Sequence, residues 1–120
     1  NFKDMEMVIL TQNTMVSLNG MTVKRTQKIA ERTEDVMMGA IKAQMIETLK
    51  NKMANGVAHF VFKKKNGELR EAWGTIQSNI ASAKTNGRGE SRENYFTTAY
   101  FDIEKGAWRS FRWETLIKVF

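Results

Sequence analysis

The chain of 120 residues contains no cysteine and a single histidine. Without cysteine it has no disulfide bond, no thiolate nucleophile and no zinc or iron–sulfur site built on thiolates, which favours an intracellular setting. No apolar run approaches the roughly 20 residues of a membrane-spanning helix, and no segment resembles a secretory signal. Because domains typically contain about 100 to 150 residues, we expect one soluble domain that does not engage a membrane.

Recognisable catalytic motifs are also missing. His59 has no accompanying Ser-His-Asp set, and neither a phosphate-binding Gly-x-x-x-x-Gly-Lys motif nor a dinucleotide-binding Gly-x-Gly-x-x-Gly motif occurs. The carboxylate pairs Glu68 with Glu71 and Asp102 with Glu104 have the chemistry for acid–base or magnesium work, but they flank predicted turns, where solvated acids are common. We therefore expect a protein that is not an enzyme and needs no cofactor or metal.

An excess of positive charge is the main clue to function. Nineteen Lys and Arg against thirteen Asp and Glu give a net charge of +6, which suits a polyanionic partner or an acidic protein surface. Part of this excess lies in residues 63–92, where seven basic residues accompany three acidic ones.

The composition changes near Gly56. All eight methionines lie at or before Met53, whereas eleven of the twelve Phe, Tyr and Trp residues lie at or after Phe60. The first half is therefore predicted to be helical and the second half to be β, which gives an α+β fold.

Residues 26–56 are predicted to form a helical segment. Within it, apolar side chains recur every three or four residues at Met38, Ile41, Met45, Leu49 and Met53. Thr33 is a candidate N-cap, Asn55-Gly56 a candidate stop, and Gly39 marks either a close packing contact or a break. The methionine stripe suits a core or a pliable interface with a partner.

The first 25 residues are predicted to form an arm. Residues 5–10 suit a short strand. Residues 15–18 and 21–24 flank Asn19-Gly20, a pair that favours the two-residue turn of a β-hairpin.

Residues 57–120 are predicted to form a five-stranded small β-barrel or a rolled sheet, because apolar and polar residues alternate in short segments rich in aromatic and β-branched side chains. The predicted strands are Val57–Lys63, Leu69–Thr75, Tyr95–Ile103, Ala107–Arg112 and Ile117–Phe120. Glu104-Lys105-Gly106 is predicted to be a tight turn and Glu114-Thr115-Leu116 a single helical turn. Residues 76–93 follow the first hairpin and precede the predicted strand Tyr95–Ile103. They form a long polar loop, which is either functional or disordered.

The register of the first hairpin depends on its turn. A two-residue turn opposes Phe62 and Glu71, which places a carboxylate among phenylalanines. A three-residue turn with Gly67 in the left-handed conformation opposes Phe60 and Ala72 instead and gives one apolar face. We prefer the second register.

The three tryptophans are expected to differ in exposure. In the preferred register Trp73 lies on the face opposite the phenylalanines and is partly exposed. Trp108 and Trp113 are expected in the core, and buried Phe111 alternates with exposed Arg112.

A resemblance to known proteins rests on two strings, VAHFVFKKKNGELREAWGT at 57–75 and YFDIEKGAWRSFRWETLI at 100–117. They resemble a family of small WYL-related proteins from bacteria and their phages, and the resemblance implies an Sm-like SH3 β-barrel fold. It implies a location in the cytoplasm of a bacterial host cell, or in a virion. In WYL domains, basic and aromatic residues of the barrel receive a ligand thought to be nucleic acid or a nucleotide, and Arg109 and Arg112 are the residues most similar to that basic set.

The sequence therefore predicts a binding module for nucleic acid or a nucleotide-like anion, in which cations attract phosphates and an aromatic ring stacks on bases. The predicted site residues are Lys63, Lys64, Lys65, Arg70, Trp73, Arg88, Arg92, Arg109 and Arg112. The alternative for the lysine run is an ordinary solvated hairpin turn.

The alternative function is that of a structural or assembly protein, for example a phage virion component. A methionine-rich helix, an N-terminal arm and the edge strands of a small barrel all suit a protein partner or a homo-oligomer. Asn1 in place of an initiator methionine indicates proteolytic processing, as in components of phage particles, or a trimmed chain.

Overall fold

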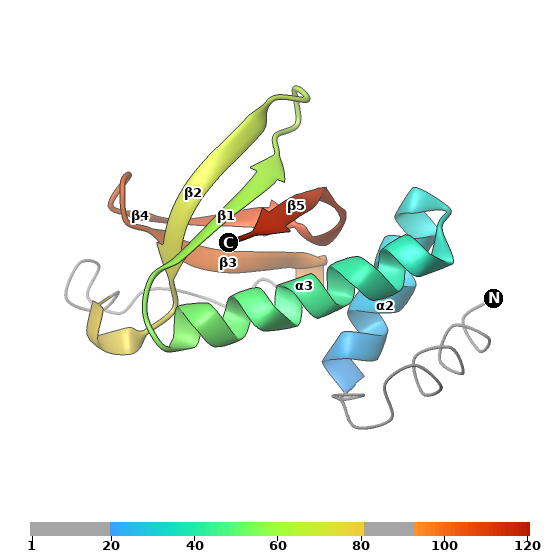
Figure 1. The fold of residues 1–120 in the computed structure, drawn as a ribbon, viewed down its shortest axis with the longest axis horizontal. Helices are drawn as coiled ribbons and strands as arrows, with labels where there is room; N and C mark the ends of the chain where they lie inside the picture. Colours follow the sequence, from blue (N-terminus) through green and yellow to red (C-terminus); the bar gives the residue numbers. More distant parts are fainter. Residues whose placement is uncertain (1–19, 81–92) are drawn as a thin grey trace. The chain divides into compact units, whose positions relative to one another are not determined.

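The computed structural model describes residues 20–80 and 93–120 (Figure 1). The chain divides into two compact units, Asn1–Gln44 and Met45–Phe120. The predicted strand at 5–10, the first half of the predicted hairpin and most of the predicted loop lie outside the described residues. In the part of the chain that is described, no helix is long and apolar enough to cross a membrane.

The first unit contains helix α2 (Gly20–Thr33), so the predicted hairpin around Asn19-Gly20 is wrong. The buried side chains of α2 recur every three or four residues and form one stripe: Thr22, Arg25, Thr26, Ile29 and Ala30. This helical period extends through residues 21–24 and outweighs the local turn preference of the Asn-Gly pair.

Helix α3 (Val36–Ala54) begins in the first unit and ends in the second. The chain breaks between the helices at Glu34, whose φ of 57° lies in the left-handed region. Asp35 caps α3, because the Met38 backbone N–H donates to its Oδ1 at 2.9 Å. The predicted cap is therefore corrected from Thr33 to Asp35, since Thr33 ends α2 and donates its hydroxyl to the Ile29 carbonyl at 2.7 Å.

Gly39 lies inside α3 at a close contact with α2, without breaking the helix. A Cβ atom on Gly39 would lie 2.6 Å from the Thr26 carbonyl oxygen and 3.0 Å from the Ala30 side chain. Of the two predicted roles of this glycine, close packing is the one that the structure shows.

The second unit contains a five-stranded antiparallel sheet in the order β4-β3-β2-β1-β5 (Figure 1). Together with the helices, it confirms the predicted α+β class. The strands are β1 (Ala58–Lys63), β2 (Leu69–Thr75), β3 (Thr97–Asp102), β4 (Ala107–Arg112) and β5 (Leu116–Val119). All five agree with the predicted segments to within two residues at each end.

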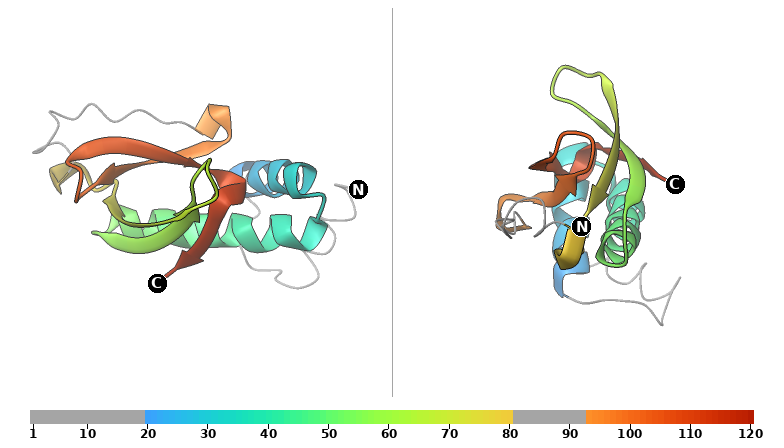
Figure 2. Two further views of the ribbon diagram at one scale, coloured as in Figure 1. Left: turned by 90° about the horizontal axis from the view of Figure 1, so that it is seen from above. Right: turned by 90° about the vertical axis from the view of Figure 1, so that its left-hand side faces the viewer.

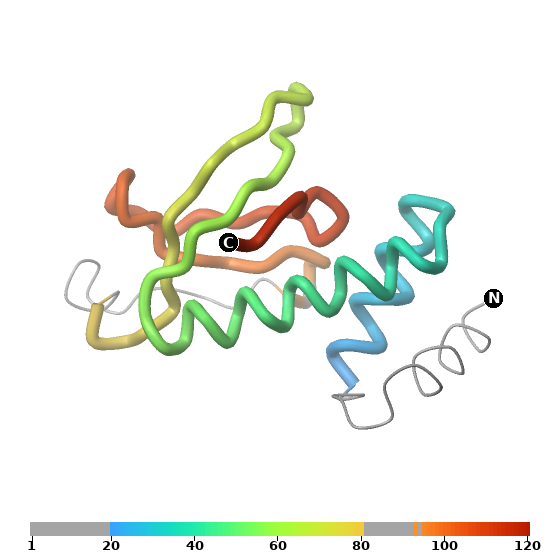
Figure 3. The backbone as a smooth tube through the Cα atoms, viewed as in Figure 1, coloured from blue at the N-terminus to red at the C-terminus, as the bar shows by residue number. Residues whose placement is uncertain are grey.

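The first hairpin adopts the preferred register, with Phe60 opposite Ala72. Figure 3 traces its two strands to the turn that joins them. Gly67 has a φ of 90°, as the three-residue turn requires. The predicted turn at Glu104-Lys105-Gly106 is confirmed by the bond from the Gly106 N–H to the Asp102 carbonyl at 2.8 Å.

The core of the sheet joins strands that are not neighbours. The Phe111 ring on β4 lies 5.7 Å from the rings of Phe60 and Phe62 on β1, although β2 and β3 lie between these strands in the sheet. The sheet is therefore curled (Figure 2). Phe111 is buried and Arg112 exposed, as the alternation predicted.

A buried polar network holds the short 3-10 helix η1 (Glu93–Tyr95), which precedes β3. The Trp113 indole N–H donates to the Thr98 hydroxyl at 3.1 Å, and that hydroxyl donates to Glu93 at 2.8 Å. The Lys50 ammonium of α3 lies 3.4 Å from the same carboxylate. One acidic side chain thereby links η1 to β3 and to the end of α3.

The two tryptophans that were expected in the core differ in burial. Trp113 is 0% exposed, so its predicted place is confirmed. It begins a second short 3-10 helix, η2 (Trp113–Thr115), where the single helical turn was predicted. Trp108 on β4 is only half-buried and packs edge-on against Phe101 with ring centroids 5.8 Å apart, so its predicted place is corrected to the border of the core.

The end of α3 is bonded to β2. The Met53 carbonyl accepts the Thr75 hydroxyl at 3.0 Å and the Ile76 N–H at 3.1 Å. The helix ends at Ala54, directly before the predicted stop.

Gly74 makes room for the ring of Tyr100 on β3. A Cβ atom at this position would lie 2.6 Å from Cδ2 of Tyr100 and 3.2 Å from the Phe60 ring. Tyr100 is 0% exposed and packs edge-on against Phe60 with ring centroids 5.0 Å apart. A side chain at position 74 would therefore collide with the Tyr100 ring.

We expect Gly74→Ala to lower the free energy of unfolding by about 1–3 kcal/mol, because the added methyl group overpacks the core. Urea titration followed by circular dichroism measures the change. Gly20→Ala is the matched control, since a Cβ atom there meets nothing within 4 Å. Equal stability of the two variants would contradict the proposed crowding at Gly74.

Candidate functional site

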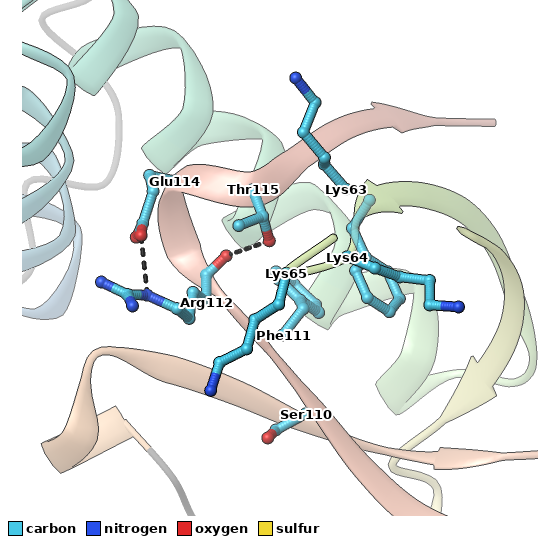
Figure 4. Close-up of a pocket in the computed structure, with 9 residues that line it drawn as sticks. Lys63, Lys64, Lys65, Ser110, Phe111, Arg112, Glu114 and Thr115 are labelled. Atoms are coloured by element: carbon cyan, nitrogen blue, oxygen red, sulfur yellow. Dashed lines mark hydrogen bonds and ion pairs between the residues drawn. The ribbon is translucent and has the colours of Figure 1, made fainter. Parts of the chain in front are cut away.

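A hollow of about 460 Å³ opens between the tip of the β1–β2 hairpin and the end of β4 (Figure 4). It is lined by Phe62, Lys63, Lys64, Lys65, Ser110, Phe111, Arg112, Glu114 and Thr115. Four of the nine predicted site residues lie together here: Lys63, Lys64, Lys65 and Arg112.

The hollow combines apolar rings with a basic rim. Phe62 and Phe111 lie with ring centroids 5.7 Å apart and planes at 27°, so they form an apolar floor. Lys65 extends toward Ser110, whereas Lys63 and Lys64 extend in other directions (Figure 4). Within residues 20–80 and 93–120, no ion pair joins these three lysines to a carboxylate. Their charge is therefore available to an anion.

Arg112 is oriented from two sides. Its Nε donates to Glu114 at 2.8 Å, and its carbonyl accepts the Thr115 hydroxyl at 2.6 Å. The guanidinium is half-exposed and has its terminal N–H groups left for a ligand. An arginine held in this way presents a planar, preorganised donor set to an oxyanion.

Arg70 is committed to a different role. Its Nη2 donates to Oδ2 of Asp102 at 2.5 Å, and Asp102 is 0% exposed. The other carboxylate oxygen, Oδ1, accepts the Lys105 backbone N–H at 3.0 Å. Arg70 neutralises a buried carboxylate between β2 and β3, and it does not line the hollow.

Trp73 lies on the opposite side of the sheet from the floor of the hollow. The His59 ring stacks on it at 4.4 Å with planes at 7°, and Phe120 stacks on the other face of His59 at 4.0 Å. One face of the indole is therefore occupied within the fold.

The remaining predicted residues are dispersed. Arg109 is exposed on β4 opposite Tyr100 but is absent from the lining of the hollow. Arg88 and Arg92 lie outside the described residues.

The sequence did not identify the floor and the acidic partner of the site. Phe62 and Phe111 were assigned to the core, and their alternation with exposed neighbours gave no sign that they also face a hollow. Glu114 carried a weak signal, because it lies two residues after Arg112 and begins the predicted helical turn.

The pKa of Tyr100 is clearly shifted. Burial disfavours the tyrosinate, and the nearby Asp102 charge adds to this effect; together they raise the pKa of Tyr100 from 10.0 to about 12. Its buried hydroxyl has no hydrogen-bond partner within the described residues. Burial of this hydroxyl therefore lowers the free energy of unfolding, because no hydrogen bond compensates for its lost hydration.

We expect the free energy of unfolding to fall between pH 10 and 12 by about 2 kcal/mol on account of Tyr100. In this window the unfolded chain loses the phenolic proton while the folded chain keeps it, so each unfolding event releases a proton. Urea titrations across the window measure the slope.

The control is Tyr100→Phe, which removes this proton and is expected to leave stability at neutral pH unchanged or slightly higher. Parallel pH curves for the two proteins would contradict the shifted pKa.

Comparison with known proteins agrees with the resemblance seen in the sequence. The chain matches the family model described as WYL_2, Sm-like SH3 beta-barrel fold, over residues 46–117, a range that includes every residue lining the hollow. It is 33% identical over 81 residues to an "Uncharacterized 11.5 kDa protein in Gp31-cd intergenic region" of Enterobacteria phage T4, covering 65% of this chain and 79% of that protein. No solved structure matches. On the strength of the family match, this chain belongs to the WYL_2 family, whose fold is described as an Sm-like SH3 β-barrel.

Proposed function

We propose that the protein is a non-enzymatic binding module, built on a five-stranded Sm/SH3-like barrel, that holds nucleic acid or a nucleotide-like anion in the hollow. The observation that carries this proposal is the combination of two rings, Phe62 and Phe111, with the lysines of the hairpin tip. An anion with an aromatic part matches both components.

The physical basis is the same for a single strand and for a free nucleotide. Phosphates gain free energy from lysine and arginine by releasing condensed counterions, and bases gain it by stacking on aromatic rings. The volume of about 460 Å³ suits such a ligand, because binding sites for small molecules typically measure about 300–1,000 Å³.

Glu114 is expected to fix the orientation of the Arg112 side chain in the site. It holds Arg112 by its Nε, so the guanidinium plane is fixed while its outer edge faces the ligand. The carboxylate also repels anions that approach from its own side, so phosphates are directed toward Lys65. The site is thus expected to favour one ligand orientation.

The similarity to a phage T4 protein supports a phage-related or regulatory role. On this proposal the protein acts in the cytoplasm of the bacterial host cell, or in the virion if it is packaged.

A structural or assembly role is the second candidate. Met37 is 44% exposed and Ile41 is 52% exposed, one turn apart on α3. Exposed apolar side chains at this spacing suit a contact with another protein.

Fluorescence anisotropy with a labelled, mixed-sequence single-stranded oligonucleotide tests the binding proposal. We expect Lys65→Glu to weaken binding about tenfold or more, because a charge-assisted bond is replaced by repulsion. The logarithm of affinity is also expected to depend less steeply on the logarithm of salt concentration, by about 0.7 for each phosphate that the variant no longer neutralises.

Lys105→Glu is the matched control, since it makes the same change of charge in the exposed β3–β4 turn. It is expected to alter affinity less than about twofold, apart from the general effect of net charge. Equal reductions of affinity in both variants, or no binding by the unmodified protein at low salt, would overturn the proposed site.

A further inference from the structure

The side of the sheet that faces away from Phe60 carries apolar and charged side chains that do not line the hollow. We call it the outer face and define it by six residues of β1, β2, β5 and the segment directly after β5: His59, Val61, Glu71, Trp73, Lys118 and Phe120. Alternation along β1 and β2 places these side chains opposite the core.

The outer face exposes apolar surface. Phe120 is 48% exposed, and the flanking Val57 and Leu69 are 48% and 62% exposed. Such a concentration of exposed large apolar side chains over a few strands is typical of an interaction surface.

The aromatic rings of this face are already stacked on one another. Trp73, His59 and Phe120 form a continuous stack, and the Lys118 ammonium lies 4.5 Å from the centre of the Phe120 ring. A nucleobase cannot stack on His59, because both faces of that ring are occupied. The exposed edges of the stack form a surface better suited to protein than to bases.

The charges of the outer face are arranged on either side of β1. Val61 is opposite Lys118 on β5 and opposite Glu71 on β2, so a base and an acid flank the central strand in one row. The Glu71 carboxylate lies 3.2 Å from Nε2 of His59, yet 54% of its side chain stays exposed. The next row has the same form, because His59 lies between Phe120 and Trp73.

This arrangement is self-complementary under a two-fold rotation about an axis parallel to β1. The rotation exchanges the two sides of the strand, so Lys118 of each copy faces Glu71 of the other. The same rotation places Phe120 over Trp73. A closed, isologous contact requires this kind of patch.

We propose that the outer face binds a second copy of this chain to form a symmetric dimer. Each copy has a net charge of +6, so two copies repel one another in most orientations. In the two-fold arrangement, two ion pairs between Lys118 and Glu71 provide an orientation in which the copies attract. This dimer does not depend on the proposed nucleic-acid site, which uses the hairpin tip and the end of β4.

Sedimentation equilibrium of the full chain over a range of concentrations tests the dimer through a charge swap. We expect the unmodified protein to show a monomer–dimer equilibrium. Glu71→Lys and Lys118→Glu alone are each expected to weaken it at least about tenfold, because like charges then oppose each other. An equimolar mixture of the two variants is expected to form a heterodimer. Glu71→Lys presents two lysines and Lys118→Glu presents two glutamates, so both facing pairs between the two copies are of opposite sign.

The matched controls are Glu104→Lys and Lys105→Glu, which reverse the same charges in the exposed β3–β4 turn and are expected to leave the equilibrium unchanged. Circular dichroism checks that each variant is folded. If a variant fails to fold, Glu71→Gln and Lys118→Gln provide the same comparison with smaller changes, and each is expected to weaken the dimer.

Three results would overturn the proposal. One is a monomer at every concentration, and another is a dimer that the charge variants do not weaken. The third is a mixture of the two variants that stays monomeric. A protein that associates only in the presence of the oligonucleotide belongs to the first case, because the outer face alone then fails to hold two copies together.

Discussion

The contact between the aromatic rings of β1 and β4 determines the shape of the sheet and the position of the hollow. In a flat sheet these strands, three spacings apart, would be separated by roughly 14 Å. Burial of Phe60, Phe62 and Phe111 against one another stabilises the curled form and brings the ends of the two strands together. As a result, Lys65 from the first hairpin and Arg112 from the end of β4 line the same cavity. The candidate binding site is therefore a direct product of core packing.

In the same core, Tyr100 has a ring that stabilises the fold and a hydroxyl that destabilises it. Its ring fills the space that Gly74 leaves open and packs against Phe60, so its apolar surface contributes to the stability of the curled sheet. Its hydroxyl is buried without a partner among the described residues, which offsets part of that contribution. Close by, Asp102 is also buried, but there Arg70 supplies the compensating charge. Removal of either partner of this pair would leave the charge of the other without compensation in the fold. Both side chains are therefore needed for stability.

Much of the fold follows from local patterns in the sequence. Alternation predicted the five strands, and the preference for one apolar face, with Gly67 in the left-handed conformation at the turn, predicted the hairpin register. The start of α3 was harder, because Thr33 and Asp35 are both good caps, and only the structure shows that α2 extends to Thr33 and leaves Asp35 to cap α3. The hollow and the role of Arg70 depend on contacts between residues distant in sequence. The sequence shows that Arg70 is basic, but only the fold shows that Asp102 lies beside it.

The ion pair between Arg70 and Asp102 has a mechanical consequence. The backbone ladder between β2 and β3 consists of two residue pairs, at Gly74 and Thr75. Beyond them, toward the tip of the hairpin, the side chains of Arg70 and Asp102 link the two strands. The hairpin is therefore anchored to β3 near Gly74. The lysines at its tip lie farther from this anchor point than the ion pair does. A small change of angle near Gly74 displaces the tip by a larger amount, so the Arg70–Asp102 pair adds to the aromatic contact between β1 and β4 in holding the basic rim near β4.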